Sequence, residues 1–231
     1  DHILTTDNEF TELGQLLNDY FVYRANILNN SVSQYLMNLV EVRELFDDLY
    51  NQYRPQCHIP MNKQKGEKKG PAYFTGIINM LMEANIGGLP IDLNPRTITT
   101  ITYDGKPLRT LSRRLDGAFP NTVNPLAIWE IKEYYFTKTF GSRVADGVYE
   151  TLLDGMEIEE LRISEKRDVL HYLMIDDHFT WWVSGRPYLC RIIDMLNMGY
   201  VDEVLFGREV VERLPEIVSE WVNIYTREQG S

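Results

Sequence analysis

The sequence is poor in cysteine and has no long apolar run. Its two cysteines, Cys57 and Cys190, lie far apart in a chain of 231 residues. Two distant thiols form neither a disulfide framework nor a zinc site, which is typical of a protein from a reducing compartment. No apolar run approaches the roughly 18 residues that span a bilayer. We therefore expect a cytoplasmic protein without membrane contact.

The sequence also lacks a secretory signal and a glycine-rich phosphate-binding loop. The first four residues, Asp1 to Leu4, include neither a basic region nor a long apolar stretch, so we expect no secretory signal. The chain does not begin with Met, which leaves open that it is part of a longer protein. The pair Gly87-Gly88 lacks the lysine and hydroxyl residue of a phosphate-binding loop, so we expect no intrinsic ATPase.

Positive charge is scarce overall but concentrated in the middle of the chain. The net charge of −11 taken alone argues against a nucleic-acid-binding protein. However, residues 1–53 carry −7, residues 54–114 carry +6 and residues 115–231 carry −10. A local basic patch can bind phosphate on an anionic protein, because salt screens charges beyond about 10 Å. Four lysines of this segment are candidate DNA contacts, although a solvated loop fits them equally well: Lys63, Lys65, Lys68 and Lys69.

Apolar residues make up 44% of the chain and aromatic residues 12%, which is enough for a sizeable core. Helical spacing of apolar residues predicts an N-terminal helical layer over residues 1–54. A polar, basic loop follows at residues 55–71. Residues 72–231 then form the predicted core domain.

The pattern within the core domain predicts a mixed α/β fold. In order, we expect a helix at 74–85, strands at 96–103, 108–116 and 126–135, a helix at 143–161, a strand at 169–175, a helix at 187–198, a strand at 201–206 and a helix at 210–225. The chain shows no internal repeat.

Asp116, Glu130 and Lys132 are the candidate catalytic residues. Alternate side chains of a strand share a face, so Glu130 and Lys132 point the same way. If the second and third predicted strands pair as an antiparallel hairpin, Asp116 lies beside Glu130. Two adjacent carboxylates repel each other, and a divalent cation such as Mg²⁺ relieves that repulsion. Lys132 could then position or deprotonate a water molecule, or stabilise a pentacovalent phosphate.

The series LDG followed by WEIK resembles the PD-(D/E)XK nuclease superfamily, whose core is a restriction-endonuclease-like αβββαβ unit. The resemblance implies that Asp116 and Glu130 are metal ligands and Lys132 the catalytic lysine. It also implies Mg²⁺, with Mn²⁺ as a possible substitute, and DNA as the substrate. Leu115 stands where the family has a proline. A restriction or phage-defence role follows only from the resemblance.

Further residues are candidates by position alone. Some members of the superfamily add an acidic ligand from the helix before the first strand, and Glu83 has that position, although it falls opposite the apolar stripe of its helix. Arg109, Arg113 and Arg114 precede Asp116, and Arg143 begins a predicted helix, so all four are candidate phosphate contacts. A solvated strand face or an ordinary ion pair explains these arginines equally well.

Two classes of function remain open on the sequence. The first is a Mg²⁺-dependent DNA endonuclease. We expect it to act as a homodimer, because two cuts in a duplex need two sites, or as a subunit active only with a protein partner. A nuclease of the same fold directed at RNA is a variant of it. The second class is a non-catalytic binding or assembly module on a degenerate nuclease fold.

Overall fold

The chain divides into two compact units, Asp1–Tyr35 and Leu36–Ser231. The computed structural model describes residues 2–62, 70–136 and 141–230. The four lysines proposed as DNA contacts, at positions 63, 65, 68 and 69, lie outside the described residues. The boundary between the units falls before the last helix of the predicted N-terminal layer.

The first unit is helical. Its elements are α1 (Glu12–Ile27), a π-helical turn η1 (Leu28–Val32) and a short α2 (Ser33–Tyr35). The Thr11 hydroxyl accepts a hydrogen bond from the Gly14 N–H and so caps α1. Several large apolar side chains of α1 are exposed, among them Leu16 and Phe21. Their helical spacing is the signal that predicted this helix.

The second unit alternates helices and strands. Its elements are α3 (Leu39–Tyr53), α4 (Tyr73–Asn85), β1 (Thr100–Tyr103), β2 (Lys106–Thr110), β3 (Gly117–Phe119), β4 (Ala127–Glu133), α5 (Ser142–Glu165), β5 (Leu170–Asp176), the π-helical η2 (Phe179–Ser184), α6 (Arg186–Asn197), β6 (Glu203–Phe206), the 3-10 turn η3 (Gly207–Glu209) and α7 (Val210–Gln229). Among the described residues, no helix is long and apolar enough to cross a membrane.

The strands form two sheets, which makes the unit a mixed α/β fold. The larger sheet has the order β3-β4-β5-β6. Strand β3 runs antiparallel to β4, whereas β4, β5 and β6 are parallel. Helix α5 connects β4 to β5, and α6 connects β5 to β6. Strands β1 and β2 form a separate antiparallel hairpin.

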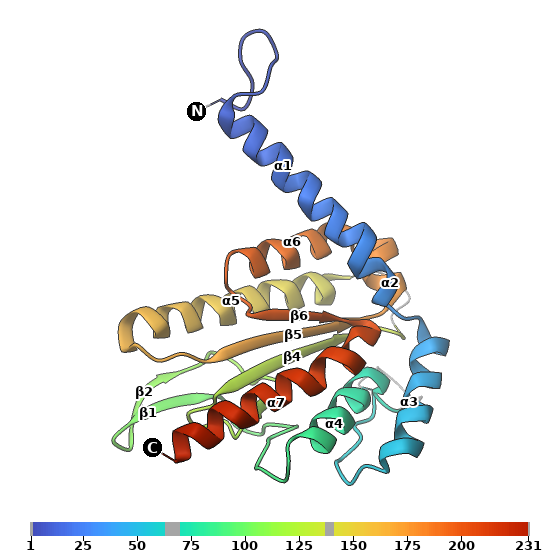
Figure 1. Ribbon diagram of the computed structural model, residues 1–231, viewed down its shortest axis with the longest axis vertical. Helices are drawn as coiled ribbons and strands as arrows, with labels where there is room; N and C mark the ends of the chain where they lie inside the picture. The colour runs from blue at the N-terminus through green and yellow to red at the C-terminus, as the bar shows by residue number, and fades with distance from the viewer. Residues whose placement is uncertain (1, 63–69, 137–140, 231) are drawn as a thin grey trace. The chain divides into compact units, whose positions relative to one another are not determined.

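Helices cover both faces of the larger sheet (Figure 1): α4 and α7 on one face, α5 and α6 on the other. On the α7 face, Trp221 is fully buried and its ring stacks on that of Trp129 at a centroid distance of 5.7 Å. The Trp221 indole N–H donates to the Tyr172 hydroxyl at 3.0 Å. A smaller apolar cluster on the α5 side contains Ile128, Ile158 and Leu161. Alternate residues of β4 therefore face different layers.

The predicted strand at 108–116 is confirmed only as far as Thr110 and is wrong for residues 111–116. Asp104-Gly105 closes the β1–β2 hairpin early, so β2 ends at Thr110. Leu111 and Leu115 are buried in the cluster on the α5 side, and the next strand begins only at Gly117. The other predicted strands and helices of the core are confirmed, with ends that shift by a few residues.

Asp176, the last residue of β5, joins the start of the second unit to the sheet. One carboxylate oxygen accepts hydrogen bonds from the N–H groups of Met37 and Asp177, both at 2.8 Å. The other accepts a short hydrogen bond from the Tyr135 hydroxyl. Burial raises the pKa of Asp176 to about 8, against the opposing effect of these donors.

The raised pKa of Asp176 predicts a stability that falls with rising pH. The folded state keeps a proton up to about pH 8 that the unfolded chain has already lost, so unfolding releases a proton below that pH. Between pH 7 and 8.5 we expect the wild type to lose about 1 kcal/mol more unfolding free energy than Asp176→Asn. Urea unfolding followed by tryptophan fluorescence measures this. Equal losses in the two proteins would contradict the assignment.

Candidate active site

Glu130 and Lys132 lie on the α5 side of β4, as their spacing predicted. Their neighbour Trp129 packs on the opposite side, against α7. The Glu130 side chain is 2% exposed, and its carboxylate lies 2.7 Å from the Lys132 ammonium nitrogen. A buried charge requires such a partner. The sheet thus holds an acidic and a basic group together in a nearly solvent-free position.

Asp116 lies next to Glu130 across the β3–β4 pair, which confirms the predicted placement. Gly117 pairs with Trp129, so Asp116, just before β3, adjoins Glu130 of β4. The Asp116 N–H donates to the Trp129 carbonyl at 3.2 Å. The Asp116 carboxylate accepts from the Ile131 N–H at 2.9 Å, where a regular ladder would offer a carbonyl. Asp116 therefore ends the ladder and is held at the sheet edge.

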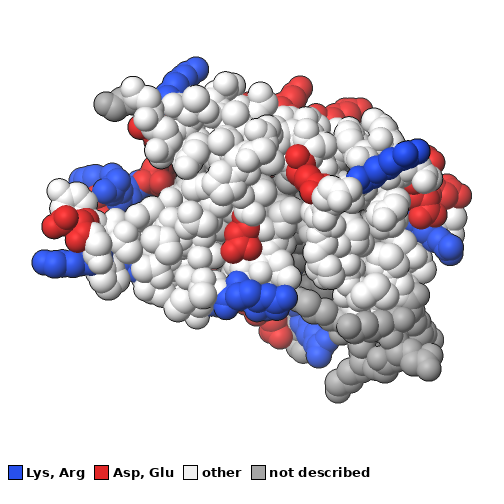
Figure 2. Space-filling view, turned by 90° about the horizontal axis from the view of Figure 1, so that it is seen from below, with Lys and Arg blue, Asp and Glu red and all other residues white. Residues whose placement is uncertain are grey.

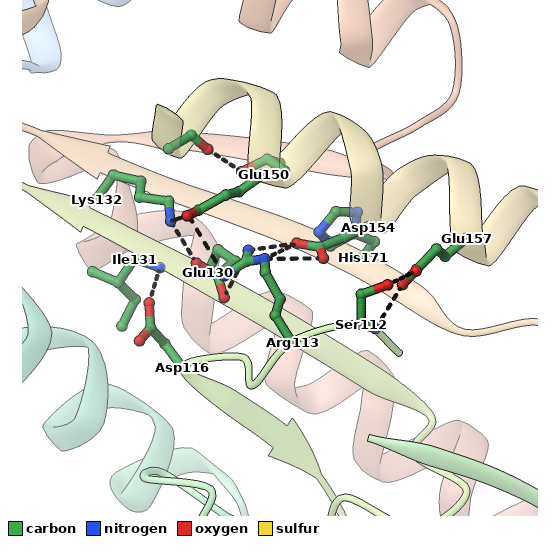
Figure 3. Close-up of polar contacts among 12 residues, drawn as sticks. Ser112, Arg113, Asp116, Glu130, Ile131, Lys132, Glu150, Asp154, Glu157 and His171 are labelled. Carbon is green, nitrogen blue, oxygen red and sulfur yellow. Dashed lines mark hydrogen bonds and ion pairs between the residues drawn. The ribbon is translucent and has the colours of Figure 1, made fainter. Parts of the chain in front are cut away.

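Arg113 is the second cation on Glu130. It comes from the loop between β2 and β3, and one guanidinium nitrogen lies 3.1 Å from the Glu130 carboxylate. The same guanidinium binds Asp154 of α5, with Nε at 3.0 and 3.1 Å from the two carboxylate oxygens. Asp154 is fully buried. Figure 3 shows Arg113 between β4 and α5, reaching both carboxylates.

Helix α5 contributes an acidic face to this network. Glu150 lies 3.5 Å from the Lys132 ammonium and 3.7 Å from the Arg113 guanidinium. Two turns further on, Glu157 accepts hydrogen bonds from the N–H and hydroxyl of Ser112. Residues 150, 154 and 157 have the spacing of one helix face. These groups were not predicted from the sequence, although their spacing indicates them.

The two cations keep their charge at neutral pH. Burial alone would lower the pKa of Lys132, but the Glu130 carboxylate outweighs burial and raises it. The same balance raises the pKa of Arg113, with Glu130 and Asp154 as the anions. Burial raises the pKa of Asp154 to about 6, even though Arg113 opposes that change. Lys132 is therefore a fixed ammonium group, which suits it to orient water or hold a phosphate oxygen and not to act as a base.

Glu133 connects the end of β4 to helix α4. Its carboxylate accepts from the Thr75 N–H at 3.0 Å, in the first turn of α4. Burial raises the pKa of Glu133 to about 7. The N–H groups of a helix start are suited to hold a carboxylate. The contact places α4 firmly at the Asp116 end of the sheet.

The remaining predicted residues lie apart from this network or have other partners. Glu83 accepts at 2.9 Å from the N–H of Gln56, a residue that precedes α4 and lies outside the β3–β4 pair. Arg109 pairs with Glu160 of α5 at 2.9 Å. Arg114 and Arg143 are exposed. Arg113, predicted as a DNA contact, is engaged by carboxylates, and both Arg113 and Arg114 lie in a loop, outside the strand predicted for them.

Few metal-ligating side chains are grouped together in the described part of the chain. Among residues 2–62, 70–136 and 141–230, no group of three or more His, Cys, Asp and Glu side chains is placed to hold a metal ion. The set of Asp116, Glu130 and Glu83 is therefore not assembled as a three-ligand site. On the face seen in Figure 2, the described Lys and Arg side chains are interspersed with Asp and Glu and form no continuous basic stripe.

Comparison with known families identifies the domain but carries no activity with it. Residues 37–221 match DUF7687, described as a domain of unknown function. The chain belongs to this family. The DUF7687 match begins near the start of the second unit and includes Asp116, Glu130, Lys132 and the acidic face of α5. Searches of the curated proteins and of the solved structures gave no match.

Gly117 is required by close packing beside the site. A Cβ at this position would lie 1.9 Å from the Trp129 indole, which is itself stacked on Trp221. We expect Gly117→Ala to lower the unfolding free energy by about 1–3 kcal/mol or more, because the ring has no room to move. A Cβ at Gly230 makes only ordinary contacts, so Gly230→Ala is the control. Urea unfolding that shows equal stability for the two variants would refute this packing.

Proposed function

We propose that the DUF7687 domain is a Mg²⁺-dependent endonuclease that hydrolyses DNA phosphodiester bonds with a PD-(D/E)XK-like site. One observation carries the proposal: Asp116 adjoins Glu130 across the β3–β4 pair, and Lys132 lies on the Glu130 side of β4 with its ammonium 2.7 Å from that carboxylate. Two acidic residues from neighbouring strands and a nearby ammonium are the groups that metal-assisted phosphodiester hydrolysis needs.

The topology around the site is compatible with a restriction-endonuclease-like core. Helix α4 precedes the sheet, β3 and β4 are antiparallel, and α5 connects β4 to the parallel β5. The place beside β3 is taken by a single bridge, in which Asp92 and Ala118 exchange hydrogen bonds of 2.9 and 3.0 Å. The β1–β2 hairpin is then an insertion beside the sheet. In this account, the three strands of the αβββαβ unit are the Asp92 segment, β3 and β4.

The donor set fits a magnesium ion that binds weakly on its own. Asp116 and Glu130 would hold it, and carboxylate oxygens are the ligands Mg²⁺ prefers. With two protein carboxylates, the other positions are left for water and phosphate oxygens, which is common for Mg²⁺ in phosphoryl-transfer sites. Mn²⁺ takes similar ligands. When bound, the ion polarises the phosphodiester and lowers the pKa of a coordinated water.

The protein's own groups position the reactants and stabilise developing charge. The rigid strand β4 fixes the positions of Glu130 and Lys132 relative to each other. The Lys132 ammonium, charged at neutral pH, orients the attacking water or stabilises the negative charge that develops on the phosphate. The surrounding burial strengthens that interaction, because charges in a poorly solvated site are weakly screened.

A non-catalytic module on a degenerate nuclease fold is the second candidate. The observation that favours it is the closed ion-pair network, in which Glu130 is already neutralised by Lys132 and Arg113. Such a network can serve stability or assembly alone. A restriction or defence role, a homodimer and an activating subunit remain predictions from the sequence.

Cleavage of supercoiled plasmid distinguishes the two candidates. We expect nicking and linearisation with Mg²⁺ or Mn²⁺ and none with EDTA. Lys132→Met removes the ammonium and lowers the rate by at least about 100-fold. Lys106→Met, the same change at an exposed position of β2, leaves the rate unchanged.

Parallel assays with single-stranded DNA and with RNA identify the substrate class. Metal-dependent cutting of RNA alone would replace DNA as the substrate and keep the site. Absence of cutting of all three nucleic acids, or equal cutting by wild type and Lys132→Met, would contradict the proposed function.

A further inference from the structure

The Glu130 carboxylate is occupied by two cations before any metal or substrate arrives. Lys132 lies at 2.7 Å and Arg113 at 3.1 Å. A divalent cation placed on the same carboxylate would be repelled by both, and charges at these distances interact strongly in a poorly solvated site. Lys132 lies on the same strand as Glu130, and its ammonium is also paired with Glu150 at 3.5 Å. Metal binding at Glu130 therefore requires the Arg113 guanidinium to move away.

Arg113 has a second anchor that allows this movement. Its Nε binds both oxygens of Asp154 at 3.0 and 3.1 Å, and Glu150 lies at 3.7 Å. If the guanidinium leaves Glu130, its charge stays compensated by Asp154, so the movement does not leave an unpaired charge. The neighbouring Ser112 is tied to Glu157 by its N–H and its hydroxyl. The backbone next to Arg113 is thus held against α5, while the Arg113 side chain has one partner on β4, Glu130, and another on α5, Asp154.

Arg113 is also suited to receive a phosphate group. Its side chain is 22% exposed, whereas that of Glu130 is 2% exposed. The planar guanidinium binds phosphate oxygens with two parallel hydrogen bonds. A phosphodiester that reaches Lys132 brings its negative charge within the same network, and it competes with Glu130 for the guanidinium.

We propose that Arg113 is a positioning residue that neutralises Glu130 in the resting site and transfers to an incoming phosphodiester, so that metal binding and phosphodiester binding strengthen each other. This inference rests on the function proposed above. Because such coupling is reciprocal, phosphodiester raises metal affinity by the same factor as metal raises phosphodiester affinity. The resting site then binds metal weakly and is not loaded until a nucleic acid is present.

Calorimetric titration of the full chain with Mn²⁺, without nucleic acid, tests the inference. Arg113→Gln removes the competing charge, and we expect it to bind Mn²⁺ about tenfold tighter than the wild type or better. Asp154→Asn weakens the second anchor and keeps Arg113 on Glu130, so we expect weaker binding. Arg162→Gln removes an arginine that pairs with Asp168 instead, and it is the control with unchanged affinity.

The same Mn²⁺ titration is repeated with a phosphorothioate duplex, which resists cleavage. We expect the duplex to raise the Mn²⁺ affinity of the wild type by a larger factor than that of Arg113→Gln. A purely structural role for Arg113 would not produce opposite changes in Arg113→Gln and Asp154→Asn. If Arg113→Gln does not fold, as judged by circular dichroism, Arg113→Lys replaces it, because a lysine cannot hold both carboxylates at once.

The outcomes separate this inference from the proposed function, since plasmid cleavage is measured on the same samples. Cleavage by the wild type together with equal or weaker Mn²⁺ binding by Arg113→Gln overturns the role of Arg113 and keeps the nuclease. Tighter binding by Arg113→Gln without cleavage of any nucleic acid supports the role of Arg113 and overturns the hydrolytic function. No Mn²⁺ binding by any of the proteins, either alone or with the phosphorothioate duplex, overturns both.

Discussion

The buried carboxylate of Glu130 is the constraint on which the rest of the site depends. A carboxylate with 2% exposure is strongly destabilising unless cations compensate it. The fold supplies Lys132 from the same strand and Arg113 from the loop before β3. Arg113 in turn needs Asp154, which is itself fully buried. Each buried charge in the network is thus compensated by a neighbouring charge of opposite sign.

Packing around β4 determines where the Glu130 carboxylate lies. Trp129 packs against Trp221 on one side of β4, which fixes the strand and directs Glu130 to the other side. Gly117 lets β3 approach that tryptophan closely. Asp116 then replaces a main-chain acceptor at the edge and binds the Ile131 N–H. The apolar layer and the polar site are consequences of the same alternation along one strand.

The sequence predicted those parts of the site that follow from local periodicity. The alternation of β4 was sufficient to place Glu130 and Lys132 on one face. Asp116 was expected beside Glu130 through a strand at 108–116, whereas the pairing that brings it there starts at Gly117. The strand β3 could not be predicted, because three residues show no periodicity. The partners of Arg113 could not be predicted either, since they depend on how α5 packs on the sheet. The position of Arg113 just before Asp116 suggested a phosphate contact, whereas tertiary packing places carboxylates around it.

Membership of the DUF7687 family places the chain among related sequences, whereas the geometry of the site indicates which chemical groups are available. The family match covers the site without assigning it an activity. The geometry offers two carboxylates at a sheet edge beside an ammonium group that stays charged. Whether this group of residues is a metal centre or a closed structural network depends on whether a divalent cation can displace Arg113 from Glu130.

The most direct test of the account is the location of Mn²⁺ by anomalous scattering in crystals of the protein with a phosphorothioate duplex. The account predicts an anomalous peak between the carboxylates of Asp116 and Glu130, with the Arg113 guanidinium moved from Glu130 to a phosphate. A peak elsewhere, or an undisturbed Arg113–Glu130 ion pair without a peak, would contradict it.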